Sequence, residues 1–496
     1  METNNKYNTK VTEEEIANGV KDEYGCIYSP DGKRLLKGNK DIESYTIKEG
    51  TEIICNNAFS ICYSLESIVI PKSVTEIGDG AFEECISLQS IVIPNSVTEI
   101  GEASFIRCYS LESIVIPKSV TEIDGYAFLE CTSLESIVIP ELVTEIGSRP
   151  FPLGIDLTSL SSRFVVENDL LIDLKEKRLI QCLNDKDTVD IPDSVTKIDN
   201  YAFSRCESLQ SITIPNSVTK IGEYAFLECE SLQNIVIPES VTEIGDRAFH
   251  ECSALESIFI PESVTKIGDG TFYECESLQS IVIPNSVTKI GAMAFCWCRS
   301  LESIVIPNSV TKIGAMAFWL CSSLQSIVIP ESVTEIGDRA FTPGVELTLH
   351  SGKFLVEDDL LIDLEKKRLI QCLKDKDSVV IPDSVTTICN YVFSGCKSLQ
   401  SIVFPESVTK IGDNAFWWCS SLQSIIIPNS ITKIGGGVFG HCKSLQSIVI
   451  PDSVTEIDDN IFEGCESLEN IVIPKGTREY FEGLLERRYH ELLTEE

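Results

Sequence analysis

Cysteine is the residue type with the greatest capacity for chemistry in this chain of 496 residues, which has 20 cysteines and only four histidines. Thiols in such number could form disulfides or bind zinc. Fourteen of them share one position of a repeated pattern: Cys62, Cys85, Cys108, Cys131, Cys206, Cys229, Cys252, Cys275, Cys298, Cys321, Cys396, Cys419, Cys442 and Cys465.

Stacked copies of a repeat lie about 5 Å apart, which is within disulfide reach. Their thiols would run parallel into the core, however, and this geometry is poor for pairing. We therefore expect buried free thiols that act as small apolar residues. There is no C-x-x-C pair, and Cys296 and Cys298 would face one side of a strand without a second pair. The sequence therefore predicts no metal site.

Other catalytic patterns are missing from the sequence. The four histidines are dispersed, and there is no G-x-S-x-G, P-loop or H-E-x-x-H motif. The acidic run Glu357-Asp358-Asp359 lacks the ligand spacing of a calcium loop and is interpreted as solvated surface. We expect a protein that is not an enzyme and has no cofactor.

Aromatic residues gather in the short segment between a repeated Phe and the repeated Cys, and methionines lie just before that Phe in two of the same repeats. All four tryptophans lie there, Tyr273 lies one repeat earlier, and Met293 and Met316 replace charged or Gly residues of other copies. The tryptophans are Trp297, Trp319, Trp417 and Trp418. Exposed, these residues would form a protein- or glycan-binding site, because aromatic and Met side chains are enriched at interfaces. Buried, they would form a second small core.

The element that positions all these residues is a 23-residue repeat, represented by L-Q-S-I-V-I-P-N-S-V-T-E-I-G-E-A-S-F-I-R-C over Leu88–Cys108. Its apolar residues alternate as in a short strand, and Pro94 ends that strand. Gly101 allows a sharp corner, and Phe105 fills the middle of the coil. One unit cannot bury its own apolar side, so copies must stack. The predicted fold is a repeat solenoid, mainly β with short turns or 3-10 segments, forming a leucine-rich-repeat arc.

The strand side that points away from the core has columns of Ser and Val, and Phe259 is the aromatic residue in the Val column. Such a sheet face is a usual docking surface of a solenoid. Equally, β-branched residues are simply good strand formers. Phe259 is thus another candidate for ligand binding.

Three hairpin patterns interrupt the repeat, at Gly25–Leu36, Phe164–Cys182 and Phe354–Cys372. After a Thr477 N-cap, an apolar stripe that includes Phe481 and Leu493 predicts a final capping helix. The sequence therefore predicts an N-terminal leader (1–23), three blocks of a hairpin plus leucine-rich repeats (24–153, 154–343 and 344–474) and a C-terminal capping helix (475–496).

The formal net charge of -36 disfavours nucleic acid and anionic membrane surfaces as partners. No window approaches the roughly 18 apolar residues of a membrane-spanning helix, so no membrane insertion is expected. Residues 1–25 are polar and acidic and lack the pattern of a signal peptide.

The S-L-x-S-I-V-I-P-x-S-V-T-x-I-G-x-x-A-F-x-x-C units, the F-x-V-x-x-x-L-L-I-D-x-x-x-K-R-L-I inserts and the Pro-Lys-Gly-Thr segment at 474–477 resemble the BspA-like, or Treponema-type, leucine-rich-repeat family. The resemblance covers about nine-tenths of the chain. It implies a surface or secreted protein that adheres to a protein or glycan ligand. The missing signal-peptide pattern and the expected free thiols favour the alternative, an intracellular protein-interaction scaffold.

Overall fold

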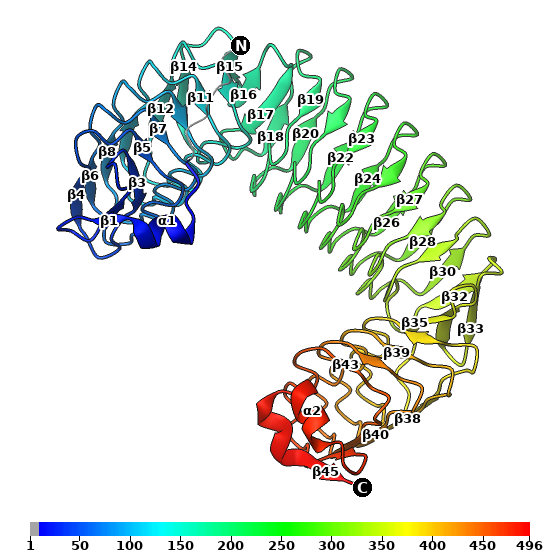
Figure 1. Cartoon of the computed structure of the whole chain (residues 1–496). Helices are drawn as coiled ribbons and strands as arrows, with labels where there is room; N and C mark the ends of the chain where they lie inside the picture. The colour runs from blue at the N-terminus through cyan, green and yellow to red at the C-terminus, as the bar shows by residue number, and fades with distance from the viewer. Residues whose placement is uncertain (1–8) are drawn as a thin grey trace, which may run out of the picture. The chain divides into compact units, whose positions relative to one another are not determined.

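The computed structural model describes residues 9–496, and its backbone contacts divide the chain into two units, Met1–Cys252 and Ser253–Glu496. Each unit is a solenoid of short strands and turns (Figure 1), as the 23-residue repeat predicts. Among the described residues, no helix is long and apolar enough to cross a membrane.

Each rung of the solenoid has a first strand, a shorter second strand and a turn segment. In one rung, β8 (Ser90–Val92) is followed by β9 (Glu99–Ile100) and then by turns up to Cys108. Ile91 is buried, whereas the flanking residues of β8 are exposed, so the period-two pattern of the sequence is confirmed.

The strands of the N-terminal unit fall into three sets. The first strands are β4 (Ser44–Thr46), β6 (Ser67–Val69), β8, β10 (Ser113–Val115), β12 (Ser136–Ile139), β14 (Asp156–Ser159), β18 (Thr188–Asp190), β20 (Ser211–Thr213) and β22 (Asn234–Val236). The second strands are β5 (Ile53–Ile54), β7 (Glu76–Ile77), β9, β11 (Glu122–Ile123), β13 (Glu145–Ile146), β19 (Lys197–Ile198), β21 (Lys220–Ile221) and β23 (Glu243–Ile244). The hairpin strands are β1 (Val20–Lys21), β2 (Ile27–Tyr28), β3 (Arg34–Lys37), β15 (Phe164–Glu167), β16 (Leu170–Asp173) and β17 (Arg178–Cys182).

The C-terminal unit repeats this arrangement. Its first strands are β24 (Ser257–Phe259), β26 (Ser280–Val282), β28 (Ser303–Val305), β30 (Ser326–Ile329), β32 (Glu346–Leu349), β36 (Ser378–Val380), β38 (Ser401–Val403), β40 (Ser424–Ile426), β42 (Ser447–Val449) and β44 (Asn470–Ile473). Its second strands are β25 (Lys266–Ile267), β27 (Lys289–Ile290), β29 (Lys312–Ile313), β31 (Glu335–Ile336), β37 (Thr387–Ile388), β39 (Lys410–Ile411), β41 (Lys433–Ile434) and β43 (Glu456–Ile457). Its hairpin strands are β33 (Phe354–Glu357), β34 (Leu360–Asp363) and β35 (Arg368–Cys372), and a last strand, β45 (Leu493–Glu495), follows the helices.

Neighbouring rungs pair in parallel, and the register joins equivalent positions of the repeat. Ser113 lies opposite Ser90, for example, and Ile114 opposite Ile91. Identical residues therefore form columns along each unit, so a change in one rung alters one place in a column.

The core of each unit contains a stack of phenylalanine rings. Phe295 and Phe318 lie nearly parallel, with ring centroids 5.4 Å apart. The repeated cysteines lie beside this stack, and the Cys321 thiol donates a hydrogen bond to the Phe295 carbonyl at 3.0 Å. All 20 cysteines are free, and all are buried except Cys465, which is half-buried. The expected burial of the repeated cysteines is confirmed for all but the half-buried Cys465, and the thiol also has a specific acceptor.

The repeated glycine is needed for close approach between rungs as well as for the corner. A Cβ added at Gly314 would lie 2.3 Å from the backbone nitrogen of Ala292, in the preceding rung. No side chain fits at that distance without moving the backbone of one rung.

The three interruptions are three-stranded antiparallel units, one strand more than a hairpin. β16 pairs with β15 and β17, and β17 then pairs in parallel with β19, which returns the chain to the solenoid. Asp173, at the end of β16, is fully buried and pairs with Arg163 at 2.7 Å and Arg178 at 3.3 Å. β33–β35 and β1–β3 have the same order. The division of the chain into blocks at these places stays a prediction.

The ends differ in part from expectation. In the N-terminal leader, residues 1–8 lie outside the described residues, and α1 (Glu13–Asn18) begins with a capping box between Thr12 and Glu15. The predicted capping helix is shorter than its apolar stripe: α2 (Arg478–Leu484) is followed by a 3-10 helix (Arg487–Leu492) and by β45. β45 pairs in parallel with β44 and so satisfies the backbone hydrogen-bonding groups at that edge of the sheet.

Candidate functional site

The structure places the eight candidate residues of the C-terminal unit at three separate locations. Phe259 lies on the outer face of the first strands. Tyr273, Met293, Trp297, Met316 and Trp319 lie on the turn segments of three consecutive rungs, and Trp417 and Trp418 lie on a turn beyond β33–β35. The four tryptophans form one group in the sequence pattern. In the structure, the three-stranded insertion β33–β35 separates Trp297 and Trp319 from Trp417 and Trp418.

Phe259 begins a stripe of exposed apolar side chains that we call the strand-face stripe (Phe259, Val282 and Val305). Their exposed fractions are 51%, 79% and 77%. They belong to β24, β26 and β28, which lie side by side in Figure 1. Adjacent strands are about 4.8 Å apart, so the three side chains form a continuous apolar strip. Exposed serines, such as Ser280 and Ser303, run beside it.

The turn cluster is held together by the backbone. The Trp297 amide donates to the Trp319 carbonyl at 2.8 Å, and the Met293 amide donates to the Ala315 carbonyl at 2.8 Å. Trp297, Met293, Met316 and Trp319 are all half-buried. Each side chain is therefore partly packed and partly exposed, and ligand binding by this cluster stays a prediction.

Arginines cover the packed sides of the two tryptophans. The Arg299 guanidinium carbon lies 4.5 Å from the Trp297 ring centroid, and that of Arg339 lies 3.5 Å from the Trp319 ring centroid. Such cation–π contacts stabilise by about 0.5 to 2 kcal/mol, more when the pair is desolvated. Arg299 is exposed, whereas Arg339 is half-buried, so Trp319 is the more firmly held ring.

The second tryptophan pair packs around a histidine. The His441 ring lies 4.8 Å from the Trp417 ring, edge to face, and 4.9 Å from the Trp418 ring, in a stacked arrangement. Trp418 is 42% exposed, whereas Trp417 is half-buried. Trp418 is therefore the tryptophan most available to a ligand.

Several candidates have left-handed backbone conformations. Met293, Trp297, Met316 and Trp418 have φ values of 53°, 66°, 54° and 62°. The same positions of other rungs also have positive φ whatever residue they hold, as at Ala103 and Arg107. The conformation belongs to the repeat, so it does not mark these residues as functional.

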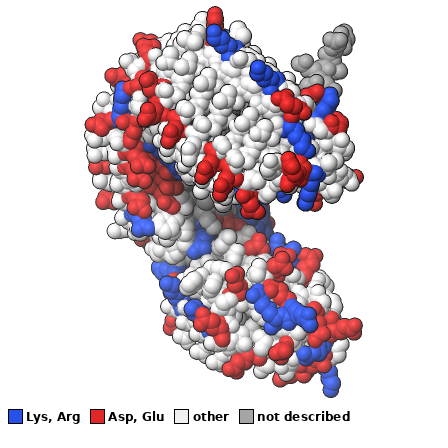
Figure 2. Space-filling view, turned by 90° about the vertical axis from the view of Figure 1, so that its left-hand side faces the viewer, with Lys and Arg blue, Asp and Glu red and all other residues white. Residues whose placement is uncertain are grey.

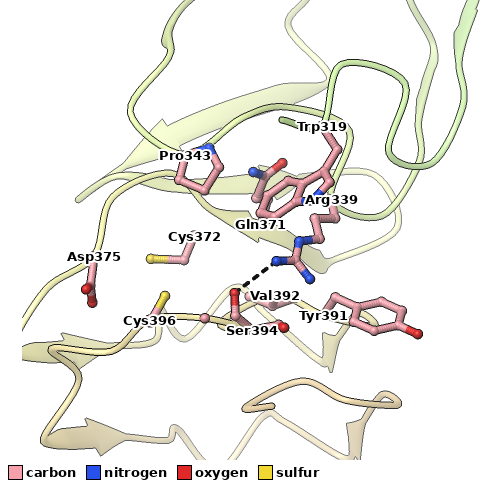
Figure 3. A pocket seen from close by; sticks show the side chains of 11 residues that line it. Trp319, Arg339, Pro343, Gln371, Cys372, Asp375, Tyr391, Val392, Ser394 and Cys396 are labelled. Atoms are coloured by element: carbon pink, nitrogen blue, oxygen red, sulfur yellow. Dashed lines mark hydrogen bonds between the residues drawn. The ribbon is translucent and has the colours of Figure 1, made fainter. Parts of the chain in front are cut away.

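The sequence interpretation missed Arg339, which lies at the junction between the last rung before β33 and the first rung after β35. Its guanidinium lies between the rings of Trp319 and Tyr391, and it donates to the Ser394 carbonyl at 3.2 Å (Figure 3). A cavity of about 40 Å³ lies beside it. The signal was present in the sequence, because Arg339 repeats Arg149 of the N-terminal unit at an offset of 190 residues.

The sequence interpretation also missed a tyrosine ladder in the N-terminal unit, at the repeat position of Met293 and Met316. Ring centroids of Tyr126 and Tyr201 are 5.6 Å apart, and those of Tyr201 and Tyr224 are 4.8 Å apart. A tyrosine two residues before the repeated Phe was the available signal.

The residue directly before the repeated Cys is charged more often in the N-terminal unit than in the C-terminal unit. Before the repeated Cys, the N-terminal unit has ion pairs from Arg107 to Glu84 and Glu130, and from Arg205 to Glu130 and Glu228. At this position the C-terminal unit has a set with few charges: Glu274, Trp297, Leu320, Gly395, Trp418, His441 and Gly464. Figure 2 shows one face of the molecule, on which uncharged areas lie between groups of charged residues.

The three locations offer contact surfaces. Across residues 9–496, no three His, Cys, Asp or Glu side chains are grouped so that they could hold a metal ion. What the described residues present is an apolar strip, half-exposed aromatic rings and a guanidinium beside a small cavity.

This chain has relatives among solved structures. It is similar to a leucine-rich cell surface protein from Faecalibacterium prausnitzii A2-165, with 29% identity over 66% of this chain and 98% of that one and a TM-score of 0.51. A leucine-rich repeat protein from Eubacterium ventriosum is 23% identical over 64% of this chain and 86% of that one, with a TM-score of 0.50, and supports the fold alone. No curated protein matches the chain significantly.

A sequence profile gives the family. The profile described as the BspA type leucine-rich repeat region (6 copies) matches residues 32–157, 181–301, 288–349 and 369–484. These ranges include most of the chain and all three candidate locations. The chain therefore belongs to the BspA-type leucine-rich repeat family.

Proposed function

We propose that the protein is a non-enzymatic, adhesin-like protein that binds a protein or glycan ligand at the surface of the cell that produces it. The strand-face stripe is the observation that carries this proposal. Three large apolar side chains on adjacent strands remain exposed and have uncharged Ser neighbours, whereas soluble proteins keep large contiguous apolar patches rare. A ligand that covers the stripe removes this surface from water.

The half-buried ring of Trp297 and the exposed ring of Trp418, which lie at two separate locations, provide further contact surfaces. Tryptophan contributes large contact areas at interfaces and stacks on sugar rings or apolar side chains. The cell-surface location is supported by the similarity to the Faecalibacterium prausnitzii protein, which is named a cell surface protein.

Replacement of the stripe tests the proposal. The triple variant F259S/V282S/V305S should bind at least about tenfold more weakly, a loss of about 1.4 kcal/mol, to whichever ligand a glycan array or immobilised matrix glycoproteins identify for the wild type. The matched control is V69S/V92S/V115S, which changes equally exposed positions of the N-terminal unit. Equal binding by the wild type and the first variant would contradict docking on the stripe.

The free thiols favour a second candidate function, that of an intracellular interaction scaffold. Twenty free cysteines are typical of a reducing compartment. Protease treatment of intact cells separates the two functions, because a surface protein is cleaved and an intracellular one is protected. Native protein found only in the cytosolic fraction would exclude the adhesin-like function and support the scaffold.

A further inference from the structure

Two cysteines meet at the junction between the three-stranded insertion and the solenoid of the C-terminal unit. Cys372 ends β35, and Cys396 closes the turn of the following rung. Their side chains lie near one another in Figure 3 and line the same small cavity, and the Cys372 thiol donates to the Lys374 carbonyl at 3.0 Å. Because the two residues come from different elements, their side chains converge, as a disulfide requires.

The repeated cysteines farther along the same unit also adjoin one another, but their thiols have the Phe carbonyls of preceding rungs as acceptors. The Cys419 and Cys442 thiols donate to the carbonyls of Phe393 and Phe416, at 3.2 and 3.1 Å. The corresponding carbonyl before Cys396 is that of Phe341, and it accepts a hydrogen bond from the Gln371 amide at 2.6 Å. Because Gln371 of the insertion occupies the Phe341 carbonyl, the Cys396 thiol does not bond to it and faces Cys372.

Small molecules can reach this pair of thiols. Cys372 and Cys396 both line the cavity of about 40 Å³, whose rim includes the exposed residues Pro343 and Gly395. Cys396 is 8% exposed and Cys372 is 4% exposed, whereas Cys419 is fully buried. A reacting sulfur atom would enter this cavity while the remainder of its reagent stays outside.

One cation and one carboxylate, Arg339 and Asp375, line the cavity. The Arg339 guanidinium lines it, and the Nε atom of Arg339 is buried without a hydrogen-bond partner. Burial lowers the pKa of Arg339 to about 10, so the group stays cationic at neutral pH. The charges around the pair are Arg339, which acts on Cys396, Lys376 and Asp359, which act on Cys372, and Asp375, which lines the cavity and acts on Cys396.

Cys372 is the better nucleophile of the two. Its thiolate would accept a hydrogen bond from Cys396, and this contact lowers the Cys372 pKa against the opposing effect of burial. A thiol near cations and beside a second thiol has the environment of reactive cysteines in other proteins.

We propose that Cys372 and Cys396 form a reactive dithiol site that takes a low-molecular-weight disulfide. The Cys372 thiolate attacks one sulfur of the small disulfide, so a mixed disulfide forms and one small thiolate leaves and is protonated. Cys396 then loses its proton and attacks the Cys372 sulfur, which releases the second small thiol. The pair is oxidised by two electrons to a disulfide, and the small disulfide is reduced to two thiols. The site does not depend on ligand binding at the strand-face stripe.

Thiol mapping of the folded, full-length, reduced protein tests the site with oxidised glutathione as the probe. After an acid quench, alkylation under denaturing conditions and digestion, mass spectrometry should find a peptide pair linked through Cys372 and Cys396. Cys419 and Cys442 should be recovered as alkylated thiols. Recovery of Cys372 and Cys396 as thiols for as long as Cys419 would overturn the proposal.

Two variants resolve the steps. Cys396→Ser should stop at glutathionylated Cys372, and Cys372→Ser should slow modification at Cys396 by at least about tenfold, since the better nucleophile is lost. Cys419→Ser is the matched control and should leave the wild-type rate of cross-linking unchanged. A Cys396→Ser protein that accumulates no adduct at Cys372 would contradict the assigned nucleophile.

A measurement on the wild type alone guards against variants that fail to fold. In the native protein, limiting iodoacetamide should label Cys372 ahead of Cys182, its counterpart in the N-terminal unit, because Cys182 is 2% exposed and Cys206 beside it only 1%. Labelling of Cys182 before Cys372 would overturn the argument from access.

Discussion

The backbone amide of Trp297 donates a 2.8 Å hydrogen bond to the carbonyl of Trp319, although the two residues occupy different positions of the repeat. Trp297 comes one residue before the repeated Cys, and Trp319 comes two residues before it. Their rings therefore extend from two different positions of the turn segment. Trp297 contacts Arg299, near it in the chain, whereas Trp319 contacts Arg339, which belongs to the junction.

The two tryptophans should consequently differ in their effect on stability. Trp319→Ala removes a ring that packs at 3.5 Å on a half-buried guanidinium, and we expect a loss of about 2 to 3 kcal/mol in the free energy of unfolding. Trp297→Ala should cost about 1 kcal/mol or less, because its partner Arg299 is exposed. Urea denaturation of both variants measures the difference, and equal losses would contradict the distinct roles.

Close approach between rungs should make the repeated glycine sensitive to the smallest substitution. Gly314→Ala places a Cβ 2.3 Å from the Ala292 nitrogen, and we expect it to lower the free energy of unfolding by about 3 kcal/mol. Gly483→Ala is the control, since a Cβ there meets nothing within 4 Å and the residue lies in α2. It should be neutral or stabilising by up to about 1 kcal/mol. Thermal unfolding of both variants checks the prediction.

The buried thiols should make the fold sensitive to alkaline pH. Burial raises the pKa of Cys296 to about 12 and that of Cys55 to about 11, whereas an unfolded thiol titrates near about 8.5. As pH rises above about 8.5, the unfolded chain loses protons that the folded chain keeps, so the free energy of unfolding falls by about 1.4 kcal/mol per pH unit for each such thiol.

Urea midpoints at pH 8, 9 and 10 in the presence of a reductant measure this loss. Cys296→Ala should reduce the slope by the contribution of one proton, whatever its effect at pH 8. A midpoint that does not change between pH 8 and 10 would show that the thiols remain equally protonated in both states.

The insertions should differ in their dependence on a buried carboxylate. Asp173 is fully buried and pairs with Arg163 and Arg178, whereas Asp363, its counterpart, pairs with Arg368 alone among the described residues. Asp173→Asn should therefore cost about 3 kcal/mol, and Asp363→Asn about half as much. Chemical denaturation of the two variants compares them.

Low pH should lower the free energy of unfolding as Asp173→Asn does, because both remove the negative charge of this side chain. Burial alone would raise the pKa of Asp173, but hydrogen bonds from Arg163 outweigh it and lower that pKa below the ordinary value. The stabilisation is therefore complete above about pH 4 and is lost as the pH falls below it. The variant should show a weaker loss of stability between pH 5 and 3 than the wild type, and parallel curves would contradict the buried ion pair.

The sequence by itself determined the solenoid, its rung length and the identity of the buried columns. A fixed period of 23 residues with alternating apolar positions leaves one way to bury Ile91, Phe105 and Cys108, namely against the same residues of the neighbouring copies. The interruptions at Phe164–Cys182 and Phe354–Cys372 were equally visible. The period alone did not show that each forms three strands, because the third strand rejoins the solenoid.

Only the tertiary structure decided which candidate residues share a surface. Residues 23 positions apart are neighbours by the repeat rule, but Arg339 meets Tyr391 and Cys372 meets Cys396 because an insertion folds between two rungs. Side-chain exposure also depends on such neighbours: Trp319 is covered by Arg339, whereas Trp418 and Phe259 stay open. The periodic pattern specifies contacts between equivalent positions, and the contacts that distinguish one rung from another arise where that pattern is interrupted.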